Sequence, residues 1–278
     1  MALGHAAACM LREDTPCTTY LEQFTERAAR LDELLPRWAD TERYGRQITT
    51  TLLLALDATD KDPHGPLART ALRITAYLDP AGHPVALWHA PALTAYLTED
   101  QPPIPSRFAR LRRRISQPRP VTGADAHAAL RLLDRYGLIT YDTAADQHRA
   151  VRVHALTARA VRETVPEDQQ PALAAAAADA LLELWPEVDQ PHPDLAATLR
   201  ANTDALAGHT RDVLWQPDGH PVLYRAGNSL LNAGLAASAA AYWQDMTVDS
   251  ERLLGGEHPD TLSARQPRLL LLAGGAYG

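Results

Sequence analysis

The sequence is poor in aromatic residues and in cysteine. Aromatic side chains make up only 6% of the 278 residues, whereas alanine is abundant. Small side chains suit closely packed helices better than a sheet sandwich, so this composition favours a helical fold. The two cysteines, Cys9 and Cys17, are too few for the disulfide framework of a small secreted domain. We interpret them as reduced thiols in a cytoplasmic protein.

Further absences exclude other classes of protein. No apolar run approaches the roughly 18 residues that a membrane-spanning helix needs, so we expect no membrane partner. The net charge is -7, and a surface that neutralises nucleic-acid phosphates has to be cationic, so the bulk charge disfavours DNA as a partner. The sequence has no Gly-x-Ser-x-Gly elbow, no His-Glu-x-x-His and no paired cysteine motif. We therefore predict no catalytic residues and no metal site.

Helical periodicity runs along nearly the whole chain. Hydrophobic residues make up 46% and charged residues 22%, which is ordinary for a folded globular protein. Apolar residues recur at three- and four-residue spacing, and proline or glycine separates the segments. Helices are predicted over 3–10, 18–35, 46–56, 67–78, 124–136, 155–164, 170–185, 194–208, 222–233 and 235–254, and two short helices split by Pro91 are predicted within 85–97.

A short hairpin interrupts the helices in the first half of the chain. Residues 138–141 and 151–154 are predicted as two strands, because apolar positions alternate there, and 143–148 is predicted as the turn. The order over 67–164 is then helix, helix, helix, hairpin, helix. This order is the plan of a winged helix.

Small and bulky residues alternate near the end of the chain in a pattern that resembles a tetratricopeptide repeat (TPR). The segment 251–262 is similar to the connection between kinesin-light-chain-type repeats of bacterial proteins. Within it, we expect Asp260 to cap the following helix, with Pro259 outside that helix. The resemblance implies that the repeats bind a protein or peptide partner. The residues that carry the repeat pattern are Leu223, Gly227, Leu230, Gly234, Ala239 and Trp243.

Three upstream segments resemble parts of NB-ARC proteins, the STAND-class signalling ATPases that often carry such repeats. Residues 1–8 are similar to the end of the family's Gly-Leu-Pro-Leu motif, 45–56 to the approach to its winged helix, and 151–157 to its Met-His-Asp region. In that family a winged-helix histidine contacts the phosphate of ADP and holds the inactive state. The resemblance assigns this role to His154, with Ala155 in place of the family's aspartate.

The P-loop of that family is missing from the sequence. No Gly-x-x-x-x-Gly-Lys-Ser/Thr occurs, so the backbone cradle, the lysine and the magnesium-binding hydroxyl are all lacking. We therefore expect no cofactor in this chain, although the family implies ADP or ATP for the complete protein. Because Met1 falls within the Gly-Leu-Pro-Leu motif, we expect a truncated chain whose nucleotide-binding domain would be supplied in trans.

The predicted fold is mainly α and has four parts. A helical (ARC-like) subdomain covers 1–58, and a winged-helix domain with one small β-hairpin covers 59–165. A helical linker region covers 166–221, and an incomplete set of TPR-like helical repeats covers 222–278. The first functional hypothesis is a regulatory, protein-interaction fragment of an NB-ARC/TPR signal-transduction protein, which is not itself an enzyme.

Two alternatives stay open. The first is a winged-helix transcriptional regulator that uses the arginines of 107–119 on DNA phosphates beside the helix 124–136, where Arg131 and Arg135 are the available polar side chains. The second is a non-functional remnant of a truncated gene. The arginines also fit a solvated loop or a contact with another domain. His154 likewise fits a junction histidine bonded to a neighbouring carbonyl.

Overall fold

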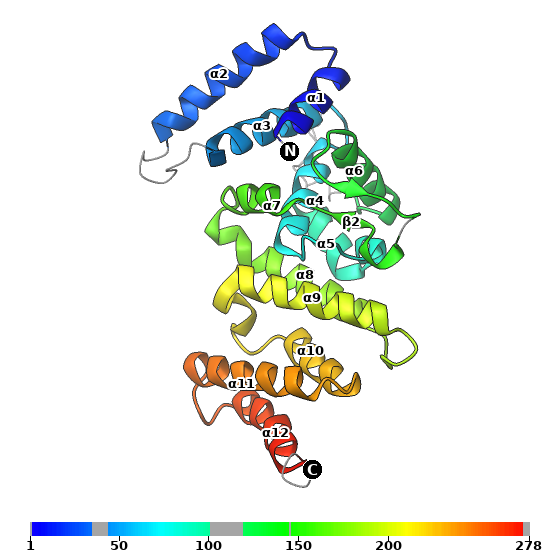
Figure 1. Ribbon diagram of the computed structural model, residues 1–278, viewed down its shortest axis with the longest axis vertical. Helices are drawn as coiled ribbons and strands as arrows, with labels where there is room; N and C mark the ends of the chain where they lie inside the picture. The colour runs from blue at the N-terminus through cyan, green and yellow to red at the C-terminus, as the bar shows by residue number, and fades with distance from the viewer. Residues whose placement is uncertain (1, 35–43, 101–118, 145, 275–278) are drawn as a thin grey trace, which may run out of the picture. The chain divides into compact units, whose positions relative to one another are not determined.

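The structure is a computed structural model that describes residues 2–34, 44–100, 119–144 and 146–274 (Figure 1). Within these ranges the fold is mainly α with one small antiparallel sheet, which confirms the predicted fold class. The chain divides into two compact units, Met1–Pro166 and Glu167–Gly278. The four-part division made from the sequence stays a prediction. In the described parts of the chain, every helix is too short or too polar to span a bilayer.

The first unit is built from helices and one hairpin. α1 packs on α3, α2 packs on α3, and α4 packs against α6 and α7. Two 3-10 helices, η2 and η3, connect these elements. The elements are α1 (Ala2–Arg12), α2 (Cys17–Leu34), α3 (Tyr44–Thr59), α4 (Gly65–Tyr77), η2 (Val85–His89), α5 (Pro91–Glu99), α6 (Gly123–Arg135), β1 (Thr140–Tyr141), η3 (Gln147–Arg149), β2 (Val151–Arg152) and α7 (Ala155–Arg162).

The core of this unit surrounds α4. Leu72 and Ile74 of α4 have no exposed surface, and neither do Trp88 of η2 and Leu130 and Leu133 of α6. Each fully buried side chain of this size contributes about 1.5–3 kcal/mol relative to an exposed one. The periodic apolar residues of 67–78 and 124–136 therefore form the faces by which α4 and α6 contact each other.

The hairpin is shorter than predicted because both strands give residues to helix ends. β1 and β2 pair antiparallel with Tyr141 opposite Val151. Leu138 is not in the strand, since its N–H bonds to the carbonyl of Leu133 and closes the end of α6. The loop before η2 adds one more rung, where the N–H of His83 donates to the carbonyl of Val151 at 3.0 Å.

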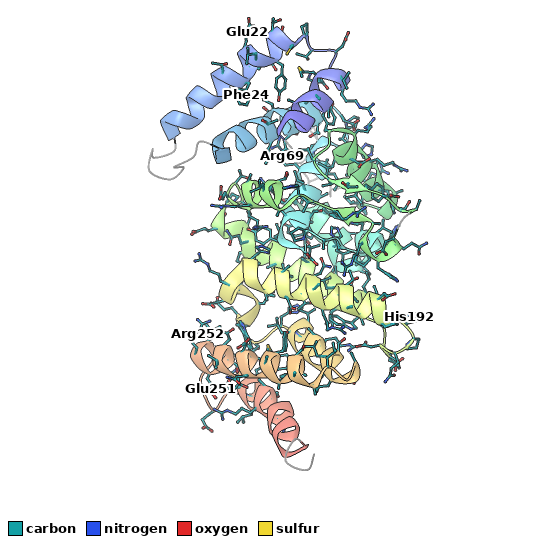
Figure 2. All side chains as sticks on the ribbon, in the orientation of Figure 1. Glu22, Phe24, Arg69, His192, Glu251 and Arg252 are labelled. Atoms are coloured by element: carbon teal, nitrogen blue, oxygen red, sulfur yellow. The ribbon has the colours of Figure 1, made fainter. Side chains whose placement is uncertain are left out.

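The second unit is a succession of helices, each packed against the next. α8 contacts α9, α9 contacts α10, α10 contacts α11 and α11 contacts α12. Arg252 of α11, labelled in Figure 2, ties this helix to η5 through an ion pair with Asp212 at 2.8 Å. The elements are η4 (Glu167–Gln169), α8 (Gln170–Leu184), α9 (Pro193–Thr210), η5 (Arg211–Trp215), α10 (Pro221–Asn232), α11 (Ala236–Leu253) and α12 (Pro259–Gly274).

A glycine lets α10 and α11 approach each other closely. A Cβ atom placed on Gly227 of α10 would lie 2.5 Å from the ring of Trp243 on α11. The Trp243 ring is 1% exposed and fills the space between the two helices. Any larger residue at position 227 would have to move this ring or the helix that carries it.

Prolines begin several of the helices. For this reason the prediction that Asp260 caps the last helix, with Pro259 outside it, was wrong. Pro259 is the first residue of α12 rather than a residue outside it, and Asp260 is its second residue rather than its cap. The cap is His258, whose ring Nδ1 accepts a hydrogen bond from the Asp260 N–H at 3.2 Å. A first-turn proline costs the helix nothing, because the N–H that it lacks has no intrahelical partner there.

Candidate functional site

His154, the predicted phosphate-contacting residue, is the N-cap of α7. Its ring Nδ1 accepts a hydrogen bond from the Leu156 N–H at 3.2 Å, and the side chain is exposed. The alternative of a bond to a neighbouring carbonyl was wrong. Because Nδ1 accepts, the proton of the neutral ring is on Nε2, which can act only as a donor. The predicted contact with an ADP phosphate stays a prediction.

The arginines considered for DNA binding are only partly described. Residues 107–114 lie outside the described residues, whereas Arg119 is exposed with its guanidinium 3.8 Å from Asp125. On α6, Arg131 is exposed and Arg135 forms an ion pair with Asp62 at 3.5 Å. One of the two predicted base-reading side chains is therefore engaged within the protein.

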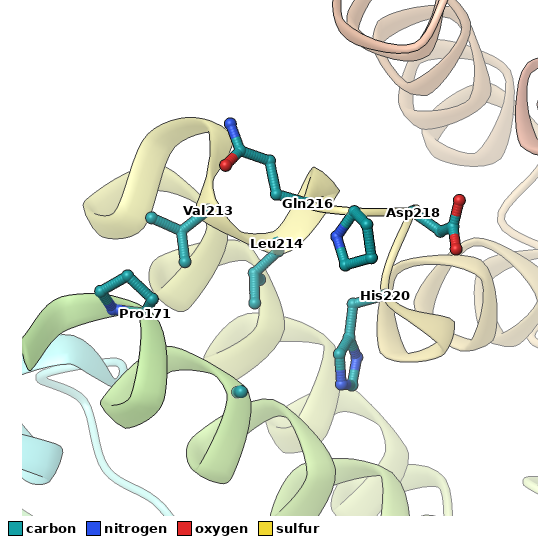
Figure 3. A pocket seen from close by; sticks show the side chains of 8 residues that line it. Pro171, Val213, Leu214, Gln216, Asp218 and His220 are labelled. Carbon is teal, nitrogen blue, oxygen red and sulfur yellow. The ribbon is translucent and has the colours of Figure 1, made fainter.

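A cavity of about 600 Å³ lies within the second unit (Figure 3). Its walls are largely apolar, whereas a carboxylate and an imidazole lie on the loop that leads into α10. The size falls in the range of about 300–1,000 Å³ that is typical of ligand sites. The lining residues are Pro171 and Ala175 of α8, Val213 and Leu214 of η5, and Gln216, Pro217, Asp218 and His220 of the following loop.

The loop 216–220 at this cavity is held on both sides. His220 caps α10 by accepting from the Val222 N–H at 3.2 Å, and its Nε2 lies 3.1 Å from the Asp179 carboxylate of α8. The Gly219 N–H donates to the Asp260 carboxylate at 2.9 Å. The cavity is therefore formed before any ligand binds, because the loop that forms one of its walls is bonded to α8 and to α12.

Asp218, His258 and Asp260 bring their ligand atoms within 4.8 Å of one another. His258 Nε2 lies 3.3 Å from the Asp218 carboxylate, while its Nδ1 accepts the Asp260 N–H. The Asp260 carboxylate already accepts from the Gly219 N–H. A metal ion on Nε2 would require the ring proton to move to Nδ1 and break the helix cap. We therefore interpret this group as a structural junction.

A chain of three aromatic polar side chains runs across the first unit. The Nε2 atoms of His89 and His127 are 2.8 Å apart, and His127 Nδ1 contacts the Tyr141 hydroxyl. Burial lowers the pKa of His127, and the neighbouring His89 and Arg131 act in the same direction. Burial also raises the pKa of the Tyr141 hydroxyl. Both shifts favour the neutral forms of His127 and Tyr141.

Nothing in the spacing of the sequence signals this chain of side chains. The two histidines come from η2 and from α6 and are 38 residues apart in the sequence. The one local signal was Gly123. A Cβ atom there would lie 2.1 Å from His89 Nδ1, so this position accepts no side chain.

A buried ion pair stabilises the second unit. Asp189 is 5% exposed and forms a salt bridge with Arg225 of α10, whose guanidinium also lies 5.1 Å above the centre of the Trp185 ring. Arg225 further donates to the carbonyl of Pro186 at 2.7 Å. All these contacts join α10 to the connection between α8 and α9, so we assign the pair a structural role.

Comparisons with known proteins give no identification. No protein-family model matches the chain, and no curated protein or solved structure matches it either.

Proposed function

We propose that the chain is a regulatory, protein-interaction region of a signal-transduction protein of the NB-ARC/TPR type, without a complete nucleotide site of its own. The observation that carries the proposal is the preformed cavity in a unit of consecutively packed helices. The close contact of Gly227 with Trp243 supports the repeat interpretation, because both residues belong to the TPR-like pattern. The helix–hairpin–helix order of the first unit supports the winged-helix interpretation.

The chemistry of the cavity indicates what kind of peptide it binds. Pro171, Val213 and Leu214 offer an apolar surface for one side chain of a partner. Burying a side chain of leucine size there contributes about 1.5–3 kcal/mol. Asp218, whose side chain is 68% exposed, lies at the same cavity and favours a cationic neighbour. The partner is therefore a peptide segment in which an apolar residue lies beside lysine or arginine.

The proposed regulation runs through His154. In this scheme the first unit packs on a nucleotide-binding domain supplied in trans, and the Nε2–H of His154 donates to a phosphate oxygen. The cap of α7 supports this scheme, since it leaves Nε2 as the donor on an exposed ring. Titration of the isolated chain with ADP should show no binding. Measurable affinity would contradict the claim that the nucleotide site is incomplete.

The peptide proposal is tested with two matched substitutions on α8. Ala175 lines the cavity, whereas Ala172 is exposed on the same helix outside it. Peptides selected from a displayed library against the full chain should contain the apolar–basic pair. Ala175→Arg should weaken their binding more than tenfold, because the long cationic side chain occupies the cavity and repels the ligand. Ala172→Arg should leave the affinity unchanged.

Two results would reject the proposal. One is a library selection that enriches no peptide, and the other is equal affinity of both arginine variants for the enriched peptides. Circular dichroism of both variants, compared with the wild type, checks that the helices are intact.

Duplex DNA serves as the competing ligand. Phosphate contacts weaken steeply as salt is added, so a regulator would bind DNA at low salt and lose it as the salt concentration rises. Such binding, reduced by Arg131→Ala and unaffected by Ala175→Arg, would favour the transcriptional-regulator alternative instead.

A further inference from the structure

Two imidazole rings from different elements meet at the surface of the first unit. His89 is the last residue of η2, and His127 lies near the start of α6. Their ring centroids are 4.9 Å apart, and the two Nε2 atoms face each other at 2.8 Å. η2 and α6 also pack directly against each other. The facing of these two nitrogen atoms is therefore set by helix packing as well as by the rings themselves.

The orientation of His127 is set by its other nitrogen. His127 Nδ1 contacts the hydroxyl of Tyr141 on β1, and the backbone N–H of Tyr141 is anchored on the Asp134 carboxylate at 2.9 Å. When Nδ1–H donates to that hydroxyl, Nε2 carries a lone pair. Histidines that bind metals usually donate their second N–H to an oxygen acceptor in this way.

The position of His89 depends on the absence of a side chain at Gly123. The ring of His89 lies over the first residue of α6, where any Cβ atom would clash with it. His89 is exposed and His127 is half-buried. An ion from solution can therefore reach both Nε2 atoms and keep water in its remaining coordination positions.

We propose that His89 and His127 form a binding site for a divalent transition-metal ion of the zinc, copper or nickel class, which both Nε2 atoms would coordinate. Imidazole nitrogen suits these ions, whereas Mg²⁺ and Ca²⁺ prefer oxygen ligands. Two nitrogen ligands at about 2.0–2.1 Å from a tetrahedral ion are about 3.3 Å apart. The observed pair therefore has to open by roughly 0.5 Å, which a small rotation of the exposed His89 ring provides.

Protons balance without any added reagent. When His127 Nδ1–H donates to Tyr141, the 2.8 Å contact between the two Nε2 atoms is a hydrogen bond donated by His89 Nε2–H. On metal binding this proton moves through solvent to His89 Nδ1, so that both Nε2 lone pairs face the ion.

The bound ion would join the end of η2 to the first turns of α6. It would therefore stabilise the first unit against unfolding, because the unfolded chain does not hold the two rings together. This site lies in the other unit from the peptide cavity, and its existence does not depend on the proposed peptide binding.

The test is calorimetric titration of the full chain with Zn²⁺ near pH 7.5, in the presence and absence of excess Mg²⁺. We expect one ion per chain, unaffected by Mg²⁺. His89→Gln and His127→Gln should each weaken binding more than tenfold, since each removes a ligand. Tyr141→Phe should weaken it about tenfold, the usual effect of losing an outer-shell partner. His192→Gln, a change at an exposed histidine labelled in Figure 2, should leave it unchanged.

A second variant separates this site from the junction at Asp218. His258→Asn removes the only imidazole of that junction and keeps a residue that can cap α12. It should bind Zn²⁺ as the wild type does. Binding lost in His258→Asn but kept in His89→Gln and His127→Gln would overturn the proposal, and so would a wild-type chain that does not bind Zn²⁺. Thermal unfolding gives an independent measurement, because Zn²⁺ should raise the midpoint of the wild type but not that of His127→Gln.

Discussion

Acid should destabilise the first unit through one buried histidine, His83. Its side chain has no exposed surface. Nε2 accepts a hydrogen bond from the indole N–H of Trp88 at 3.1 Å, and Nδ1 is buried with no hydrogen-bond partner among the described residues. Burial lowers the pKa of His83 from 6.5 to about 3, because the charged ring would lose its hydration.

The sign of the effect follows from proton binding in the two states. Between pH 6.5 and about 3 the unfolded chain binds a proton at His83 that the folded chain does not bind. The free energy of unfolding therefore falls as the pH falls through this window, and the full contribution is present only above it. At pH 5 the loss amounts to roughly 2 kcal/mol relative to pH 7.5.

The assay compares His83→Gln with the wild type in urea unfolding followed by circular dichroism at pH 7.5 and pH 5. Glutamine has an oxygen that can accept from Trp88, but it does not titrate. The wild type should lose about 2 kcal/mol more than the variant between the two pH values. His192→Gln, a change at an exposed position, should lose as much as the wild type. Equal losses in wild type and His83→Gln would refute the reasoning.

Two further predictions concern the second unit. Gly227→Ala should destabilise it by about 2 kcal/mol, because the added methyl group meets the ring of Trp243. Gly208→Ala, with open space around it, should stabilise it by about 0.5 kcal/mol. Equal effects of the two substitutions in thermal unfolding would contradict this prediction. Arg225→Met should cost about 3 kcal/mol, because the buried Asp189 carboxylate loses the guanidinium that forms its salt bridge. Arg252→Met, at an exposed ion pair, should cost at most about 1 kcal/mol in urea unfolding.

Much of the helical architecture could be predicted from the sequence. Periodic apolar residues predicted the helices around 67–78 and 124–136 because each buries one continuous face against the other. Helix ends were less predictable. The predicted helix at 194–208 runs from Pro193 to Thr210, because a proline belongs to the first turn as readily as to the loop before it.

The sites were harder to predict than the fold. The prediction of His154 rested only on its position in the segment 151–157, which resembles a family motif. The structure places His154 at the start of α7, where its ring caps the helix. The pair of His89 and His127 depends on the packing of η2 against α6, which no local pattern reports. His83 is a polar residue in a hydrophobic core, and its burial follows from the bridge to Val151 rather than from its neighbours in sequence.

The order of contacts in the first unit has a consequence for its synthesis. α7, the last helix of this unit, packs on α3 and α4, and Val151 pairs with His83. On a ribosome, the early helices would emerge long before these partners. The parts of α3 and α4 that α7 covers would stay exposed until residues 151–162 leave the exit tunnel, so a pause in translation within this stretch would lengthen the time available for aggregation or chaperone capture.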